Sequence, residues 1–144
     1  MALLLCISSV QAKPRYTPYE AFREACWLSR YSCIGIKQPM VRESPYVNLE
    51  GAHGIYMGGR TIWMGNKLPT AKERYVVMVH EMVHYLQQYV DQQGIPFTSQ
   101  FEKCVREHEA FEVSDIVAKR LKQAHLIRGG DFRSYGCGVV SASE

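Results

Sequence analysis

The chain has 144 residues, which is the size of one domain that can bury a hydrophobic core of its own. Hydrophobic residues make up 47% of the sequence and charged residues 22%, and both values are ordinary for a globular protein. The net charge is only +3 and the sequence has no run rich in Lys or Arg, so it does not indicate nucleic acid as a partner.

The first 12 residues form an apolar run that ends in Val10-Gln11-Ala12, a pattern similar to a signal-peptide cleavage site. The run is too short to span a bilayer, so no transmembrane segment is predicted. Its usual basic flank is missing, which leaves open a natural start upstream of Met1. We predict a truncated signal peptide over residues 1–12 and a single domain over residues 13–144, secreted or periplasmic. The alternative is an apolar N-terminal helix.

The cysteines support export. Apart from Cys6 in the predicted signal peptide, four remain, namely Cys26, Cys33, Cys104 and Cys137. An even set in a small exported domain predicts two disulfides, and we expect Cys26–Cys33 and Cys104–Cys137 because the first pair is close in sequence. On one unbroken helix Cys26 and Cys33 would lie about 10 Å apart, so the helix that contains Cys26 must end before Cys33. The alternative is four buried thiols in a cytosolic protein.

The N-terminal half combines one helix with short strands. Thr17 followed by Pro18 is typical of a helix start, and we expect this helix to run to about residue 29 or 30. Prolines interrupt the next segment, in which residues 40–41 and 46–47 are predicted as short strands. The segments 54–57 and 60–64 flank Gly58-Gly59, which predicts a hairpin with a two-residue turn.

Two longer helices follow, and a capping-box sequence precedes each. The first begins after Thr70, with Glu73 three residues further on, and is expected to end near Gln93. The second begins after Ser99 and is expected to run to about His125. The tail, residues 131–144, is rich in Gly and Ser and is predicted to be irregular.

The first of these helices carries the pattern H-E-x-x-H, formed by His80, Glu81 and His84. Residues four apart lie on one helix face, so His80 and His84 can bind one Zn²⁺ ion together. Gln87 and Asp91 continue this polar face. Glu81 points to a neighbouring face, from which its carboxylate can reach a water on the metal without being a ligand. We predict one zinc ion per chain with Glu81 as general base; the alternative is two histidines on a solvated helix edge.

A third zinc ligand is expected on the second helix, where two glutamates compete. Glu107 shares a helix face with small and apolar residues, which are Ala110, Phe111, Ser114, Ala118 and Leu121. A carboxylate in the middle of such a face is costly unless it is paired or bound to a metal. Glu109 lies on nearly the opposite side, where a solvated glutamate is expected. We predict Glu107 as the third ligand and keep Glu109 as the second candidate.

These two motifs resemble the gluzincin group of zincin metallopeptidases, which carry H-E-x-x-H on one helix and a glutamate on the next. The resemblance covers about Thr61 to Leu121, and in size the chain is similar to the small, minimal gluzincin domains. The chain departs at Phe111, where that pattern often has an Asp that supports a ligand histidine. The resemblance also implies a strand beside the metal cleft whose free edge pairs with an extended peptide. A plain core hairpin is the alternative for residues 54–64.

We therefore predict an α+β, zincin-like fold in which the H-E-x-x-H helix and the glutamate helix pack with a small mixed or antiparallel sheet, next to an extra N-terminal helix. The predicted function is zinc-dependent hydrolysis of a peptide or protein substrate. The oxyanion-stabilising side chain stays open among Tyr31, Tyr56, His108, His125 and Tyr135. The alternatives are an exported zinc protein that binds a partner without turnover, and a metal-free helical binding module.

Overall fold

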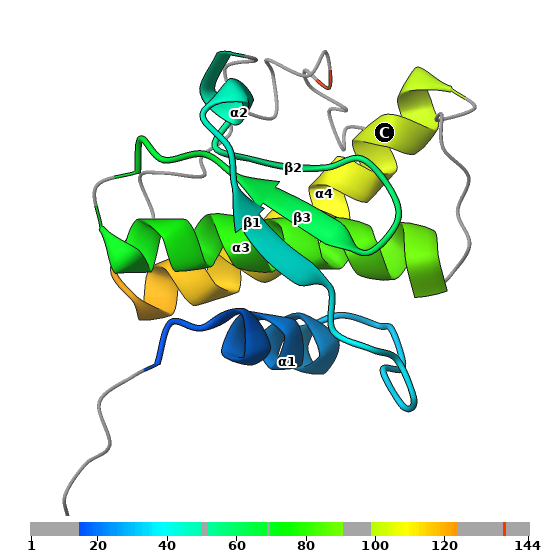
Figure 1. Ribbon diagram of the computed structural model, residues 1–144. Coiled ribbons are helices and arrows are strands. Elements are labelled where there is room, and N and C mark those ends of the chain that lie inside the picture. Colours follow the sequence, from blue (N-terminus) through cyan, green and yellow to red (C-terminus); the bar gives the residue numbers. More distant parts are fainter. Residues whose placement is uncertain (1–14, 50–51, 69, 91–98, 124–136, 138–144) are drawn as a thin grey trace, which may run out of the picture.

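The computed structural model describes residues 15–49, 52–68, 70–90, 99–123 and 137, so the predicted signal peptide and the tail after residue 137 lie outside the described part. The elements in chain order are α1 (Pro18–Leu28), β1 (Met40–Glu43), α2 (Tyr46–Leu49), β2 (Gly54–Tyr56), β3 (Thr61–Met64), α3 (Ala71–Tyr85), a π-helical turn (Leu86–Val90) and α4 (Gln100–Arg120). The predicted α+β class is confirmed (Figure 1). No helix in these described ranges is long and apolar enough to cross a membrane.

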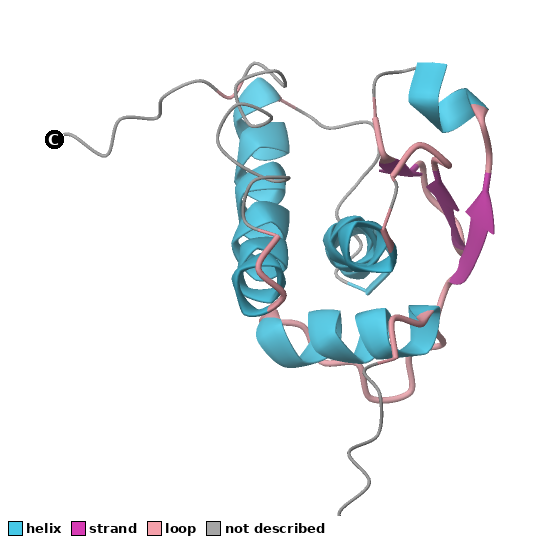
Figure 2. Cartoon of the chain, turned by 90° about the vertical axis from the view of Figure 1, so that its left-hand side faces the viewer, coloured by secondary structure: helices cyan, strands magenta, loops and turns pink. Residues whose placement is uncertain are grey.

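Helix α3 is the centre of the fold. Seen end-on in Figure 2, it lies between α4 on one side and the sheet on the other, with α1 across a third side. Every residue of α3 from Tyr75 to Tyr85 is buried, which a helix with only one packed face would not show. The polar side chains His80, Glu81 and His84 are therefore held in the interior by the packing around them.

The sheet has the strand order β1-β3-β2, with β1 parallel and β2 antiparallel to β3. Ile62 and Met64 of β3 are fully buried towards α3, so the alternation of a strand turns Trp63 to the outer face.

The predicted hairpin strands are confirmed, but the two-residue turn is wrong, because four residues (57–60) connect β2 to β3. Gly58 and Gly59 both have positive φ, and Tyr56 Oη donates a hydrogen bond to the Gly59 carbonyl across 2.8 Å.

The three predicted helix starts are confirmed. The hydroxyl oxygens of Thr17, Thr70 and Ser99 each accept a hydrogen bond from the backbone N–H three residues further on, at 3.1–3.2 Å. At Thr70 the reciprocal bond of the capping box is also present, from the Thr70 N–H to the Glu73 carboxylate. The predicted end of the H-E-x-x-H helix near Gln93 lies outside the described residues.

Two element predictions are corrected. Residues 46–47 lie in helix α2 and not in a strand, because Ser44 caps that helix through its hydroxyl and Pro45 suits its first turn. Helix α4 ends at Arg120, earlier than expected, since Lys122 adopts a φ of 59° and the Gln123 N–H returns to the Ala118 carbonyl at 2.7 Å. This closing bond is that of a Schellman motif, with lysine at the position that usually holds glycine.

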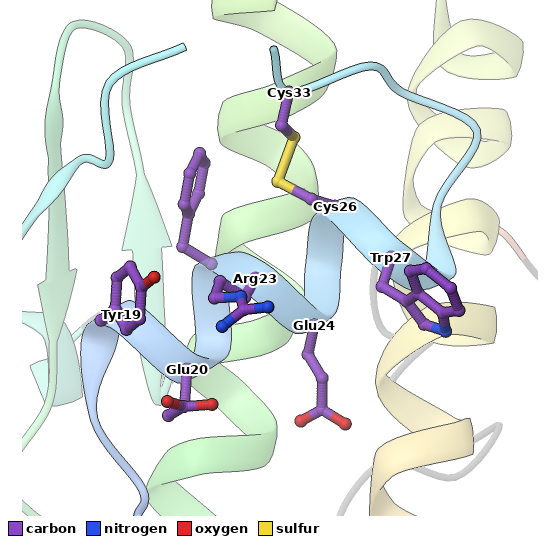
Figure 3. Close-up of a pocket in the computed structure, with 8 residues that line it drawn as sticks. Tyr19, Glu20, Arg23, Glu24, Cys26, Trp27 and Cys33 are labelled. Atoms are coloured by element: carbon purple, nitrogen blue, oxygen red, sulfur yellow. A yellow bond between two sulfur atoms is a disulfide. The ribbon is translucent and has the colours of Figure 1, made fainter. Parts of the chain in front are cut away.

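Both predicted cysteine pairs are present as disulfides, Cys26–Cys33 and Cys104–Cys137. Figure 3 shows Cys26 on α1 and Cys33 on the segment beyond its end. Helix α1 stops at Leu28, so the expected helix end before Cys33 is confirmed. Two disulfides indicate an oxidising compartment.

Glu24 of α1 joins three helices. Its carboxylate accepts hydrogen bonds from the Tyr75 hydroxyl on α3 and from the Arg120 guanidinium on α4. Burial raises the pKa of Glu24, but the hydrogen bonds from Arg120 and Tyr75 outweigh it and the pKa is lowered. Glu24 also borders a hollow of about 620 Å³ along α1 (Figure 3). The exposed side chain of Trp27 lines this hollow too.

Candidate metal centre

Three buried side chains meet between α3 and α4. His80 Nε2 lies 3.1 Å from His84 Nε2. Glu107 places one carboxylate oxygen 3.3 Å from His80 Nε2 and the other 3.3 Å from His84 Nε2. Two ligand atoms on a tetrahedral zinc ion, each about 2.0–2.1 Å from it, are about 3.3–3.4 Å apart. The spacing of the three side chains therefore fits a single ion of that size.

The local sequence explains this convergence. His80 and His84 lie one turn apart on α3, so their rings project side by side. On α4, Ala110, Ser114 and Ala118 are buried, and their small size lets the two helices approach closely. The prediction that Glu107 lies on an interior face is confirmed, since Glu107 is only 7% exposed.

Glu109, the second candidate ligand, lies outside the three-residue group. Its carboxylate pairs with the Arg30 guanidinium at 3.3 Å, at the end of α1. The geometry therefore brings Glu107, and not Glu109, to the histidines.

His84 is held by Gln87, a residue of the polar helix face for which the sequence alone predicts no role. The Gln87 side chain is fully buried. Its Nε2 donates a hydrogen bond to the Arg106 carbonyl at 2.9 Å. Its Oε1 therefore faces His84 Nδ1, which is also 2.9 Å away. Because an amide oxygen only accepts, His84 Nδ1 must carry the proton and donate it. His84 Nε2 is then the nitrogen that faces Glu107 and His80.

His80 has a weaker support. Ser114 Oγ donates to the Phe111 carbonyl at 3.3 Å and lies 3.4 Å from His80 Nδ1, which can donate to it. The Phe111 ring packs against the His80 ring with centroids 4.5 Å apart. At the position where the gluzincin pattern often has an Asp, this chain thus has an aromatic contact, and the polar support comes from Ser114 one turn later.

The electrostatics of the three side chains favour a bound cation. Burial opposes the charged form of Glu107, yet hydrogen bonds and charge from His80 and His84 lower the pKa of its carboxyl well below the usual range. Burial likewise disfavours a charged His84, but the hydrogen bond and charge of Glu107 raise the His84 pKa to about 9. Glu107 Oε2 lies 3.3 Å from His80 Nε2, but it is buried without a hydrogen bond of good geometry from any described residue. A metal ion would replace the proton of His84 and satisfy this oxygen.

Glu81 lies beside this group and faces the sheet. A Cβ atom at Gly54 of β2 would be 2.9 Å from the Cγ atoms of both Glu81 and Val77, so β2 approaches α3 this closely only with glycine there. Glu81 is 7% exposed and is not one of the three converging residues. The Cγ atom of this buried side chain thus lies against the first residue of β2.

The edge of β2 that faces away from β3 is next to Glu81. The Gly65 N–H donates to the His53 carbonyl at 2.9 Å, which identifies a hydrogen-bonded pair of the antiparallel ladder. By alternation, Ile55 directs its backbone groups to β3, while Gly54 and Tyr56 direct theirs to the other edge. No described strand pairs with that edge.

The described oxyanion candidates have other partners. The Tyr56 hydroxyl donates to the Gly59 carbonyl, and the Tyr31 hydroxyl accepts from Arg30 at 3.2 Å. Burial, with Glu109 beside it, raises the pKa of Tyr31 to about 12. His108 lies on an exposed face, 3.6 Å from Glu112. His125 and Tyr135 lie outside the described residues.

No family model, curated protein or solved structure matches this chain. The likeness to gluzincins therefore remains one of motifs, carried by the H-E-x-x-H residues of α3 and by Glu107 of α4. What the described residues add is the meeting of His80, His84 and Glu107 in one buried group that could hold a metal ion.

Proposed function

We propose that the protein is a zinc-dependent metallopeptidase, with His80, His84 and Glu107 as the ligands of one zinc ion. The observation that carries this proposal is the convergence of two imidazole nitrogens and a carboxylate at separations of 3.1–3.3 Å. Two histidines and one glutamate are a ligand set of catalytic zinc, in which a fourth position stays open. Zinc in such a site supplies Lewis acidity, which acidifies water and polarises a carbonyl group.

Glu81 acts as the general base. It is buried next to the ligands but lies outside the metal group, so its carboxylate is available for proton transfer. It accepts a proton from the attacking water and passes it to the amine that leaves when the peptide bond breaks. Gly54 leaves the space that the Glu81 side chain occupies, because a Cβ atom there would lie 2.9 Å from Glu81 Cγ.

The substrate binds as an extended peptide along β2. The backbone groups of Gly54 and Tyr56 lie on the edge next to Glu81, which no described strand occupies, and this supports strand addition there over the plain hairpin alternative. The two disulfides support an exported protein that acts in the periplasm or outside the cell.

A non-catalytic zinc protein that binds a partner is the second candidate. It is favoured by Phe111, which packs against His80 where the gluzincin pattern often has a carboxylate. Glu81 favours the enzyme, because a purely structural zinc site has no use for a base.

The substitution Glu81→Gln separates the two candidates. It keeps the size of the side chain and removes the base, so zinc content and folding should be unchanged while peptide hydrolysis falls by about 10²–10⁴-fold. The measurement is a peptide-library digest read by mass spectrometry, with wild type and Glu81→Gln both loaded with zinc. Equal cleavage by the two proteins would exclude Glu81 as the base. No cleavage by the wild type across a broad library would favour the non-catalytic binder.

A further inference from the structure

The outer face of the sheet carries an apolar groove. It encloses about 280 Å³ and is lined by Ser44, Tyr46, Val47, Ile55, Met57 and Trp63. Tyr46 and Met57 are 74% and 70% exposed, although both are large apolar side chains. Exposed apolar side chains gathered around a hollow are typical of a binding site.

This groove borders the strand that the candidate active site uses. Ile55 is the central residue of β2, and its neighbour across the ladder, Trp63, also lines the groove. The residues on either side of Ile55 face α3: Tyr56 is buried there, and Gly54 contacts Glu81. The two faces of one short strand therefore point to Glu81 and to the groove.

Strand geometry then fixes where the side chains of an added peptide point. A peptide residue opposite Gly54 directs its side chain to the same face as Gly54, towards α3 and Glu81. The next peptide residue, opposite Ile55, directs its side chain to the outer face. Since cross-strand neighbours on one face are in contact, this second side chain reaches the groove beside Ile55 and Met57.

We infer that this groove is a specificity pocket for an apolar side chain of an extended peptide that adds to the edge of β2 that no described strand occupies. The inference rests on the proposed function in its use of the edge beside Glu81. It names the substrate class as peptides with an apolar residue next to the residue that lies over Glu81. Acidic and small polar residues at that position are poor ligands, because the groove has no charged lining side chain and most of its lining is apolar.

The test measures binding in the absence of cleavage. The full chain carries Glu81→Gln, which removes the proposed base, and Trp27→Phe, which leaves Trp63 as the only tryptophan. The probes are blocked pentapeptides with threonine at every position except the central one, which is leucine, serine or aspartate. Affinity is read from the emission of Trp63 and from calorimetry, with zinc present.

The leucine peptide should bind at least about tenfold more tightly than the other two, as expected for partial burial of one leucine side chain. Its binding should shift the emission of Trp63 to shorter wavelength. Met57→Ser and Ile55→Thr should each reduce this preference, and neither removes a fully buried side chain. Met40→Ser is the matched control, because Met40 is exposed on β1 at the other edge of the sheet and does not line the groove.

Equal affinities for the three peptides, or no binding of any of them at millimolar concentration, would overturn the inference. A leucine preference that survives Met57→Ser combined with Ile55→Thr would do the same. The proposed hydrolysis fails separately: a leucine preference without cleavage by the zinc-loaded wild type supports the groove and rejects the enzyme. Cleavage of all three peptides with the same kcat/KM supports the enzyme and rejects the groove.

Discussion

Two carboxylates, the half-buried Glu24 and the buried Glu107, connect helices in this protein, and they differ in what balances their charge. Glu24 accepts hydrogen bonds from Tyr75 and from Arg120, so its charge is balanced by a cation of the protein itself. Among the described residues, Glu107 pairs with the imidazoles of His80 and His84, and its Oε2 makes no hydrogen bond of good geometry. The first group is complete as it stands, whereas the second requires a proton or a metal ion.

The two groups also differ in whether their cation can lose its proton. Arginine does not lose its proton in proteins, so the Glu24 group keeps its charge balance at any ordinary pH. His84, by contrast, is charged only through its raised pKa of about 9, and a metal ion can take the place of that proton. A structural ion pair and a metal site can therefore both be built on a glutamate that joins helices, and the cation distinguishes them.

The largest expected effect is on metal content. Purified protein should carry about one Zn²⁺ per chain, and His84→Ala or Glu107→Ala should remove most of it, because each deletes one of three ligands. Glu109→Ala is the matched control and should retain the metal, since Glu109 pairs with Arg30. Elemental analysis of the four proteins checks this. Loss of zinc from Glu109→Ala but not from Glu107→Ala would reverse the assignment.

The free energy of unfolding of the metal-free protein should depend on pH through His84, whereas the Glu24 group contributes no such dependence in this pH range. The folded-state pKa of His84 is raised from 6.5 to about 9, so the stability it contributes is fully present below pH 6.5 and is lost as the pH rises through about 9. Urea unfolding of chelator-treated protein should therefore show a falling free energy of unfolding between these values. Zinc-loaded protein should show the opposite trend, because fewer protons then compete with the metal.

Glu107→Gln is the control for this slope. It removes the charge that holds the His84 proton, so the fall in the free energy of unfolding should become shallower. A metal-free wild type whose stability is flat from pH 6.5 to 9 would show that Glu107 does not control the protonation of His84.

Gln87 should set how tightly the metal is held. Gln87→Leu leaves His84 Nδ1 without its acceptor, and losing such a support of a ligand histidine typically weakens metal affinity by about 10–100-fold. Gln87→Glu keeps an acceptor for His84 and should retain most of the affinity, although it loses the bond to the Arg106 carbonyl. Competition with a zinc-binding dye measures both. Equal affinity in wild type and Gln87→Leu would exclude this role.

Local patterns in the sequence predicted much of this structure. The helix starts at Thr17, Thr70 and Ser99 follow from side chains that cap their own helix, and spacing along a helix places His80 with His84. The position of Glu107 on an interior face follows from the small apolar residues around it. In each of these cases the cause and the effect lie within a few residues of each other.

The errors and omissions come from contacts between distant segments or from turn chemistry. The close approach of Gly54 to Glu81 and the contact of Ser114 with His80 depend on how the sheet and α4 pack on α3, which no periodicity reveals. Residues 46–49 form a helix and not the predicted strand, because Pro45, taken as an interruption, suits a first helical turn and the Ser44 hydroxyl caps it. Gln87 was visible on the polar face, but its partner Arg106 is on another helix.

The smallest expected effect is on stability and concerns the group formed by Glu24, Tyr75 and Arg120. Glu24→Gln removes the negative charge that faces Arg120 and Tyr75 but leaves a hydrogen-bond acceptor of similar size. The free energy of unfolding should fall by about 1–2 kcal/mol. This is less than the full value of a charged hydrogen bond, because Arg120 is largely exposed. Zinc affinity and hydrolysis should not change, since Glu24 has no contact with the metal group. Chemical denaturation and zinc titration of this variant beside Glu107→Gln separate the two groups, because Glu107→Gln should lose zinc affinity instead. If Glu24→Gln weakened zinc binding as much as Glu107→Gln does, the two groups would be coupled through α3, and the distinction between a structural pair and a metal site would fail.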